Sequence, residues 1–241
     1  MLILAIDTCD PIGGVAVLSG DVVLSTLSHD STEDYSAWLL PAVDSVLAQS
    51  ALKLPNVDAF AVAAGPGSFT GVRVGLTTVK AWSEVYLKPI AAVSRLEALA
   101  GFAHDGSPIV AACADGHRGQ VFGAAFRREG PATSDLLRLG EEIALPPGEF
   151  VEFAVKLAHG APISWVATNP DLLVKEEVWK SRAANGEPLA AVPGMLAVAI
   201  GNLGRRHLAS GKVTDSLSLD AHYLRREDTK SQWKDAVRSA G

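Results

Sequence analysis

The residues best suited to chemistry lie in one glycine-rich segment, residues 65–71, between an apolar run and an amphipathic helix. Its glycines permit backbone angles that other residues avoid, and its serine or threonine can cap the helix. Free amides at a helix start can hold an anion, to which a nearby arginine adds a charge-assisted contact. The candidate anion-binding residues are Gly65, Gly67, Ser68, Thr70 and Arg73.

This segment is not a P-loop, because the Gly-Lys-Ser/Thr sequence is absent. Two interpretations remain open: a phosphate or nucleotide loop, and a tight strand-to-helix turn that binds nothing. Gly71 and Gly75 lie four residues apart and therefore on one helix face. That bare strip lets another helix approach closely, either inside the protein or in a second subunit.

The sequence lacks the motifs of zinc-dependent and serine hydrolases. The six histidines never lie within four positions of one another, so no helix carries a zinc-binding pair. No Gly-x-Ser-x-Gly elbow of a serine hydrolase occurs. Cys9 and Cys113 both lie in apolar runs, which predicts free buried thiols in a reducing compartment. The sequence therefore predicts neither a metal site nor a catalytic nucleophile.

Composition narrows the class of protein. The chain has 241 residues, is 48% hydrophobic and carries a formal net charge of −6. A protein that binds a nucleic acid such as tRNA alone through its phosphates is normally basic, so this chain should contact nucleic acid at most indirectly. The chain opens with a short apolar strand that lacks a preceding basic region, and no apolar run reaches membrane-spanning length. We expect a cytoplasmic protein without a membrane partner.

Apolar periodicity predicts the elements that position these residues. Predicted strands cover residues 2–6, 13–18, 22–24, 57–63, 89–93, 109–115, 120–126, 136–145, 163–167 and 188–192. Predicted helices cover residues 32–49, 72–86, 95–103, 150–157, 174–179 and 193–209. Pro41 either kinks the first helix or marks the start of its regular part.

The opening pattern occurs twice. An apolar strand ends in Asp7 and is followed by a turn and a second apolar strand, and the same order surrounds Asp115. This repeat indicates a duplicated unit and an α/β fold of two lobes. The lobes are expected at 1–103 and 104–212, and a C-terminal segment, 213–241, should pack on the first lobe and end in a loose tail.

The string from Gly65 to Gly75 resembles the signature of the TsaB (YeaZ) family. The likeness extends to Leu4-Ala5-Ile6-Asp7-Thr8, to residues 115–122, to Leu39-Leu40-Pro41 and to Tyr223-Leu224-Arg225. It implies a two-lobed actin-like ATPase fold, that is, a duplicated ribonuclease H-like fold. It also implies a non-catalytic scaffold subunit that pairs with the catalytic subunit TsaD and, with the ATPase TsaE, supports tRNA threonylcarbamoyladenosine formation.

The resemblance assigns the pairing surface to the first two helices. The residues expected there, facing TsaD or a second copy of the chain, are Tyr35, Trp38, Leu39, Val43, Gly71, Val72, Gly75, Leu76 and Val79. Amphipathic stripes of this kind are also typical of plain core residues. The chain departs from the family where Tyr35-Ser36-Ala37-Trp38 replaces a usual His-Ser-Glu before Leu39-Leu40-Pro41, and where Cys9 replaces a serine.

Two alternatives accompany this interpretation. In the wider superfamily, aspartates placed like Asp7 and Asp115 hold a metal or orient a water, which would suit an ATP-dependent phosphotransferase. Aspartate is also common as a cap of strand ends and turns. A glycoprotease of the type once associated with the family lacks its paired histidines. We expect no cofactor for this chain alone, with ATP or ADP bound only at the interface of a complex.

Overall fold

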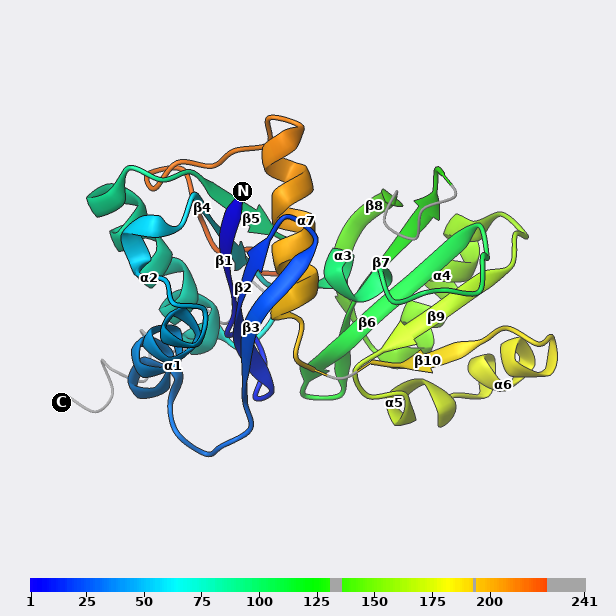
Figure 1. The fold of residues 1–241 in the computed structure, drawn as a ribbon. Coiled ribbons are helices and arrows are strands. Elements are labelled where there is room, and N and C mark those ends of the chain that lie inside the picture. Colours follow the sequence, from blue (N-terminus) through cyan, green and yellow to red (C-terminus); the bar gives the residue numbers. More distant parts are fainter. Residues whose placement is uncertain (131–135, 193, 225–241) are drawn as a thin grey trace, which may run out of the picture.

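The computed structural model describes residues 1–130, 136–192 and 194–224, and these form two lobes side by side (Figure 1). The loose tail expected after Arg226 lies outside the described residues. Each lobe contains one five-stranded sheet. Within the described part of the chain, no helix is both long enough and apolar enough to cross a membrane.

The first sheet has the order β3-β2-β1-β4-β5. Strand β1 pairs antiparallel with β2 and parallel with β4, so the opening meander continues into a parallel half. Helices α1 and α2 cover one face of this sheet (Figure 1). The elements are β1 (Leu2–Asp7), β2 (Gly13–Ser19), β3 (Val22–His29), α1 (Tyr35–Gln49), a single 3₁₀ turn (Leu54–Asn56), β4 (Ala59–Ala63), α2 (Phe69–Tyr86) and β5 (Ile90–Val93).

The second sheet repeats this arrangement in the order β8-β7-β6-β9-β10. Strand β6 pairs antiparallel with β7 and parallel with β9, as β1 does with β2 and β4. The match confirms the predicted duplication and the two-lobed actin-like fold. The elements are β6 (Ile109–His117), β7 (Gln120–Arg128), β8 (Leu136–Leu145), α4 (Pro147–Ala158), β9 (Ile163–Ala167), α5 (Asp171–Val174), α6 (Glu177–Ala184) and β10 (Leu189–Ala191).

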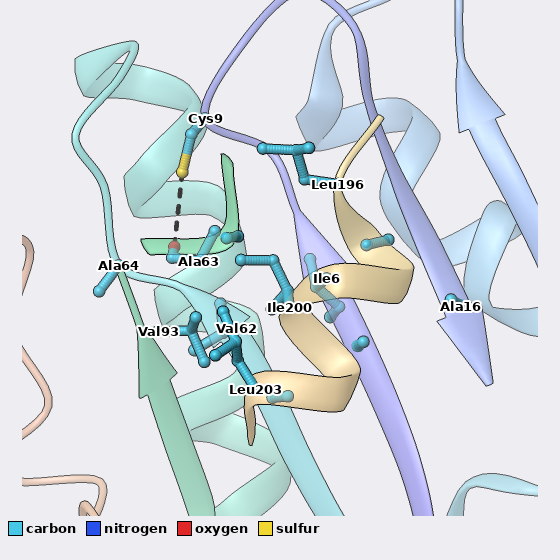
Figure 2. Packing of buried hydrophobic residues seen from close by; sticks show 14 of the residues in the cluster. Ile6, Cys9, Ala16, Val62, Ala63, Ala64, Val93, Leu196, Ile200 and Leu203 are labelled. Atoms are coloured by element: carbon cyan, nitrogen blue, oxygen red, sulfur yellow. Dashed lines mark hydrogen bonds between the residues drawn. The ribbon is translucent and has the colours of Figure 1, made fainter. Parts of the chain in front are cut away.

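Two helices cross between the lobes. Helix α7 (Ala197–Ala209) packs on β1, β2, β4 and β5 of the first sheet, whereas α3 (Arg95–Ala100) packs mainly on β6 and β7 of the second. Figure 2 shows Ile200 and Leu203 of α7 facing the first sheet. A Cβ on Gly204 would lie 2.5 Å from the Cβ of Ala61, which cannot rotate away, so glycine is needed for this close approach. Each lobe therefore receives a helix from the other half of the chain.

Three predicted helices differ in the structure. Helix α3 ends at Ala100, and α7 begins at Ala197 because the backbone oxygen of Gly194 is bound to Arg95 before the helix starts. Two short helices, α5 and α6, replace the single helix predicted over 174–179, since Glu176 has an extended backbone between them. Helix α1 runs continuously through Pro41.

The described part of the C-terminal segment lies against the first lobe. The amide of Thr214 donates to the oxygen of Ile90, and the amide of His222 donates to the oxygen of Ala64 at 2.8 Å. Leu219 is buried between these points. The segment therefore passes directly beside the glycine-rich loop.

Candidate functional site

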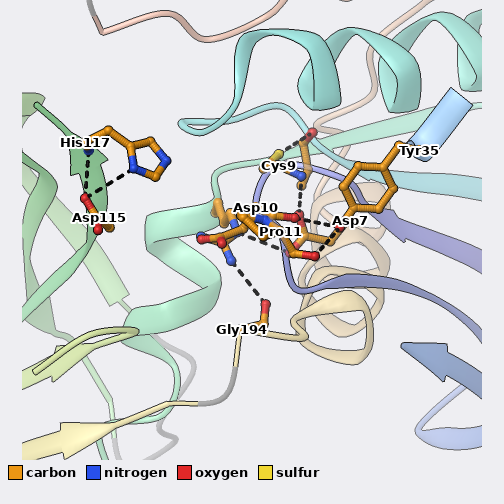
Figure 3. Close-up of polar contacts among 10 residues, drawn as sticks. Asp7, Cys9, Asp10, Pro11, Tyr35, Asp115, His117 and Gly194 are labelled. Atoms are coloured by element: carbon orange, nitrogen blue, oxygen red, sulfur yellow. Dashed lines mark hydrogen bonds and ion pairs between the residues drawn. The ribbon is translucent and has the colours of Figure 1, made fainter. Parts of the chain in front are cut away.

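A buried ion cluster occupies the end of β1 (Figure 3). Asp7 is the last residue of the strand and is fully buried. Arg95, the first residue of α3, places Nε 3.2 Å from Oδ2 of Asp7 and Nη1 2.9 Å from Oδ2 of Asp10. Its Nη2 donates to the backbone oxygen of Gly194 at 3.1 Å. One guanidinium therefore joins the first strand, the following turn and the segment before α7.

Arg95 neutralises the carboxylates that could otherwise serve as a catalytic pair. Burial alone lowers the pKa of Arg95, but the charges of Asp7 and Asp10 outweigh it and raise the pKa. The arginine therefore stays charged and holds both carboxylates as ion-pair partners. Among the described residues, no group of three or more His, Cys, Asp or Glu side chains is placed to hold a metal ion.

Asp115, the matching aspartate of the second lobe, has a different environment. It is partly exposed, and its Oδ1 accepts a hydrogen bond from the amide of His117 at 2.7 Å. That contact is the capping of a turn by an aspartate two residues upstream. The two aspartates thus share a position in the sheets but neither resembles a free catalytic base.

The thiol of Cys9 and the phenol of Tyr35, which lie beside this cluster, both have raised pKa values and favour their neutral forms. Burial, followed by the charge of Asp7, raises the pKa of Cys9 well above its usual value, and its Sγ lies 3.5 Å from the oxygen of Ala63 (Figure 2). Burial and the same carboxylates raise the pKa of Tyr35, whose hydroxyl donates to the oxygen of Asp10 at 2.6 Å. Thus Cys9 is no thiolate nucleophile, and Tyr35 fixes the start of α1 to the turn after β1.

The glycine-rich loop packs α2 against the end of β1. A Cβ on Gly67 would lie 2.2 Å from the oxygen of Cys9, and a Cβ on Gly71 would lie 2.0 Å from the oxygen of Thr8. Ser68 caps the helix, because its Oγ accepts a hydrogen bond from the Gly71 amide. Gly65 has a φ of +112°, a conformation suited to glycine. These contacts give each small residue a packing role.

The other predicted anion-binding side chains point outward. Thr70 and Arg73 are exposed on α2. The guanidinium of Arg73 lies 3.7 Å from the ring centroid of Phe69, and its Nε donates to the hydroxyl of Tyr223 at 2.8 Å. The rings of Phe69 and Tyr223 are stacked. Arg73 therefore attaches the C-terminal segment to α2.

Most of the residues predicted to form the partner interface do not lie on the surface of α1 and α2. Seven of the predicted interface residues are buried beneath it and belong to the protein's own core: Leu39, Val43, Gly71, Val72, Gly75, Leu76 and Val79. Tyr35 and Trp38 are half-buried and pack with His29 as an aromatic cluster. The correction follows from helix geometry, since the apolar stripe of each helix faces the sheet.

A groove of about 510 Å³ runs between α1 and α2 on that face. Leu40, which is 53% exposed, contributes an apolar side chain beside the groove. The exposed residues Ser36, Thr70, Arg73 and Thr77 also line it. The groove is thus lined by both apolar and polar side chains, as protein interfaces commonly are.

Arg95 was not among the residues predicted to matter. An arginine inside an otherwise apolar stretch signals a buried counter-ion, because arginine is rarely buried unless it is paired. Residues 90–100 contain that signal. The sequence does not show which carboxylates pair with it, since Asp7 lies 88 positions away.

Known proteins similar to this chain form a consistent group. The family model described as TsaD, tRNA N6-adenosine threonylcarbamoyltransferase, matches residues 27–154. The tRNA threonylcarbamoyladenosine biosynthesis protein TsaB of Bacillus subtilis is 37% identical over 129 residues, which cover 53% of this chain and 56% of that protein. TsaB of Escherichia coli is 32% identical over 131 residues, which cover 54% and 56%. The chain thus spans about half the length of the curated relatives it matches.

A solved structure covers more of the chain. A Pseudomonas aeruginosa protein described as similar to peptidase YEAZ has a TM-score of 0.76 and 26% identity, over 93% of this chain and 99% of that one. The two matching sheets and the exchanged helices define a two-lobed actin-like domain. The chain belongs to the TsaD family and, within it, to the TsaB (YeaZ) proteins.

Proposed function

We propose that this chain is a non-catalytic scaffold subunit for the formation of threonylcarbamoyladenosine on tRNA. Membership in the TsaB family supports a role in this biosynthesis, because the relatives from Bacillus subtilis and Escherichia coli are named for it. The observation that carries the non-catalytic part is the pairing of Arg95 with Asp7 and Asp10. Arg95 already pairs with Asp7, one of the two aspartates on which a metal-dependent phosphotransferase of this fold would depend.

The α1–α2 face is the proposed docking surface for a TsaD-like catalytic subunit. Leu40 is exposed on this face, and the groove beside it can accept a side chain of a partner helix. A second copy of this chain is the competing occupant of the same face. The buried glycines Gly71 and Gly75 let α2 lie close to β1, and so they set the position of this surface.

A TsaE-like ATPase completes the proposed assembly, and ATP or ADP binds at an interface of the complex. The chain alone requires no cofactor. The net charge of −6 supports an indirect relation to tRNA, in which another subunit makes the main phosphate contacts. The proposed compartment is the cytoplasm, since both buried cysteines are free.

Reconstitution tests this function. TsaD-like and TsaE-like proteins from the same organism are combined with unmodified tRNA, ATP and a threonylcarbamoyl donor, with and without this chain. We expect modification only when the chain is present, and no ATP consumption by the chain alone. Full modification in its absence would show that the chain is not a required subunit.

A matched variant separates scaffold from enzyme. Asp115 lies in the second lobe and only caps a turn, so Asp115→Asn should support modification as the wild type does. The phosphotransferase alternative would instead be favoured if Asp115→Asn folds and assembles normally but the complete complex loses ATP turnover.

A further inference from the structure

A second cavity lies between α3 and α7, at the seam of the two lobes. Its volume is about 660 Å³, within the range of small-molecule sites. Its walls come from α7, from α3 with the following Phe102, and from Leu136 at the start of β8. None of its lining residues belongs to the Arg95 cluster or to the α1–α2 groove. Junctions between lobes are places where ligand sites commonly occur.

The cavity changes character along α7. Met195, Val198 and Ala199 give one end an apolar wall, whereas Asn202, Arg205 and Arg206 line the other end. A helix rises 1.5 Å per residue, so the side chains of these two groups are separated by roughly 10 Å. That length suits a molecule with a bicyclic apolar body and one polar end group.

The polar end contains two arginines, Arg205 and Arg206, beside the carboxylates of Asp21 and Glu97. Arg205 uses its Nη2 to donate to Oδ1 of Asp21, and its side chain, which is 32% exposed, also lines the cavity. Glu97, the other carboxylate of the cavity, lies 3.3 Å from Nε2 of His207. Asp21 and Glu97 therefore each already face a basic side chain, so neither carboxylate opposes an anionic group beside Arg205 as an unpaired charge.

We propose that this cavity binds a small amphipathic anion, with its apolar body against Met195 to Ala199 and its acceptor group against Arg205. The acceptor is a sulfonate, carboxylate or phosphate oxygen, because a charged acceptor makes the stronger hydrogen bond to a guanidinium. The occupant contacts α3 and α7 together and so links the two lobes. This site is independent of the proposed partner face.

Two matched fluorescent probes test the site in the full chain. One is 8-anilinonaphthalene-1-sulfonate, and the other is N-phenyl-1-naphthylamine, which has the same ring system without the sulfonate. We expect the sulfonate probe to bind one site. Ala199→Trp, which fills the apolar end, should weaken both probes by about tenfold or more. Arg205→Gln should weaken the sulfonate probe by about tenfold and change the neutral probe by less than about twofold.

Thr77→Trp, which fills the α1–α2 groove instead, is the control and should leave both affinities unchanged. Hydrogen exchange of the wild type provides a test that needs no variant: the sulfonate probe should protect α3 and α7. Protection confined to α1 and α2, or an unchanged affinity in a folded Ala199→Trp protein, would overturn the proposal. Equal weakening of both probes by Arg205→Gln would overturn the role of the anionic group.

Discussion

Replacement of Arg95 by methionine should destabilise the protein strongly. The arginine side chain is 1% exposed and contacts Asp7, which is 0% exposed. Methionine keeps the apolar packing but leaves the Asp7 carboxylate without its buried partner. Removal of one member of a buried ion pair costs about 3–5 kcal/mol. For a chain of this size, that loss lowers the melting temperature by roughly 6–20 °C.

Urea unfolding followed by circular dichroism measures this loss. Arg127→Met is the matched control, because the Arg127–Glu129 pair is about half exposed on both sides. Its cost should stay below about 1 kcal/mol. The double variant Asp7→Asn/Arg95→Met should be more stable than Arg95→Met by roughly 1–3 kcal/mol, since it removes the unpaired charge. A cost below about 1 kcal/mol for Arg95→Met would refute the reasoning.

Three further predictions concern other parts of the chain. Gly71→Ala should lower the unfolding free energy by about 1–3 kcal/mol or more in urea titrations, because its Cβ would meet the oxygen of Thr8 at 2.0 Å, whereas Gly101→Ala, 3.3 Å from its nearest neighbour, should cost little. Burial raises the pKa of Glu142, but contacts with His222 and Ser94 outweigh it and leave the pKa below its usual range. The ionised carboxylate therefore stabilises the fold above about pH 4.3, and the difference between wild type and Glu142→Gln should shrink as the pH falls further; a difference that grows in acid would contradict this sign. Burial raises the pKa of Cys113 to about 12, so a thiol reagent at pH 8 should label it only after unfolding, and rapid labelling of the native protein would contradict its burial.

Much of the fold could be predicted from apolar periodicity. The strand ending in Asp7 and its counterpart ending in Asp115 predicted the duplication that the two sheets confirm. The exchange of α3 and α7 could not be predicted, because an apolar helix face shows that it is buried but not which sheet it covers. The same ambiguity explains why Leu76 and Val79, which are core residues, resembled an interface.

The candidate site was less predictable because its partners are distant in sequence. Local reasoning predicted Ser68 or Thr70 as the helix cap, and the structure shows Ser68 in that position. It could not pair Arg95 with Asp7 or Arg73 with Tyr223, which lie 88 and 150 positions apart. The packing role of a glycine is the hardest to predict from sequence. The close approach of Gly67 to Cys9, for example, is recognised only when the three-dimensional positions of both segments are known.

Titration calorimetry of this chain with a TsaD-like subunit from the same organism tests the central claim most directly. Leu40→Arg changes a 53%-exposed side chain on the α1–α2 face, and Val174→Arg changes a 48%-exposed one on the second lobe. A one-to-one complex should form with the wild type and with Val174→Arg, and Leu40→Arg should weaken it by about thirtyfold or more. Equal binding by a folded Leu40→Arg protein, or no binding by the wild type, would contradict the account.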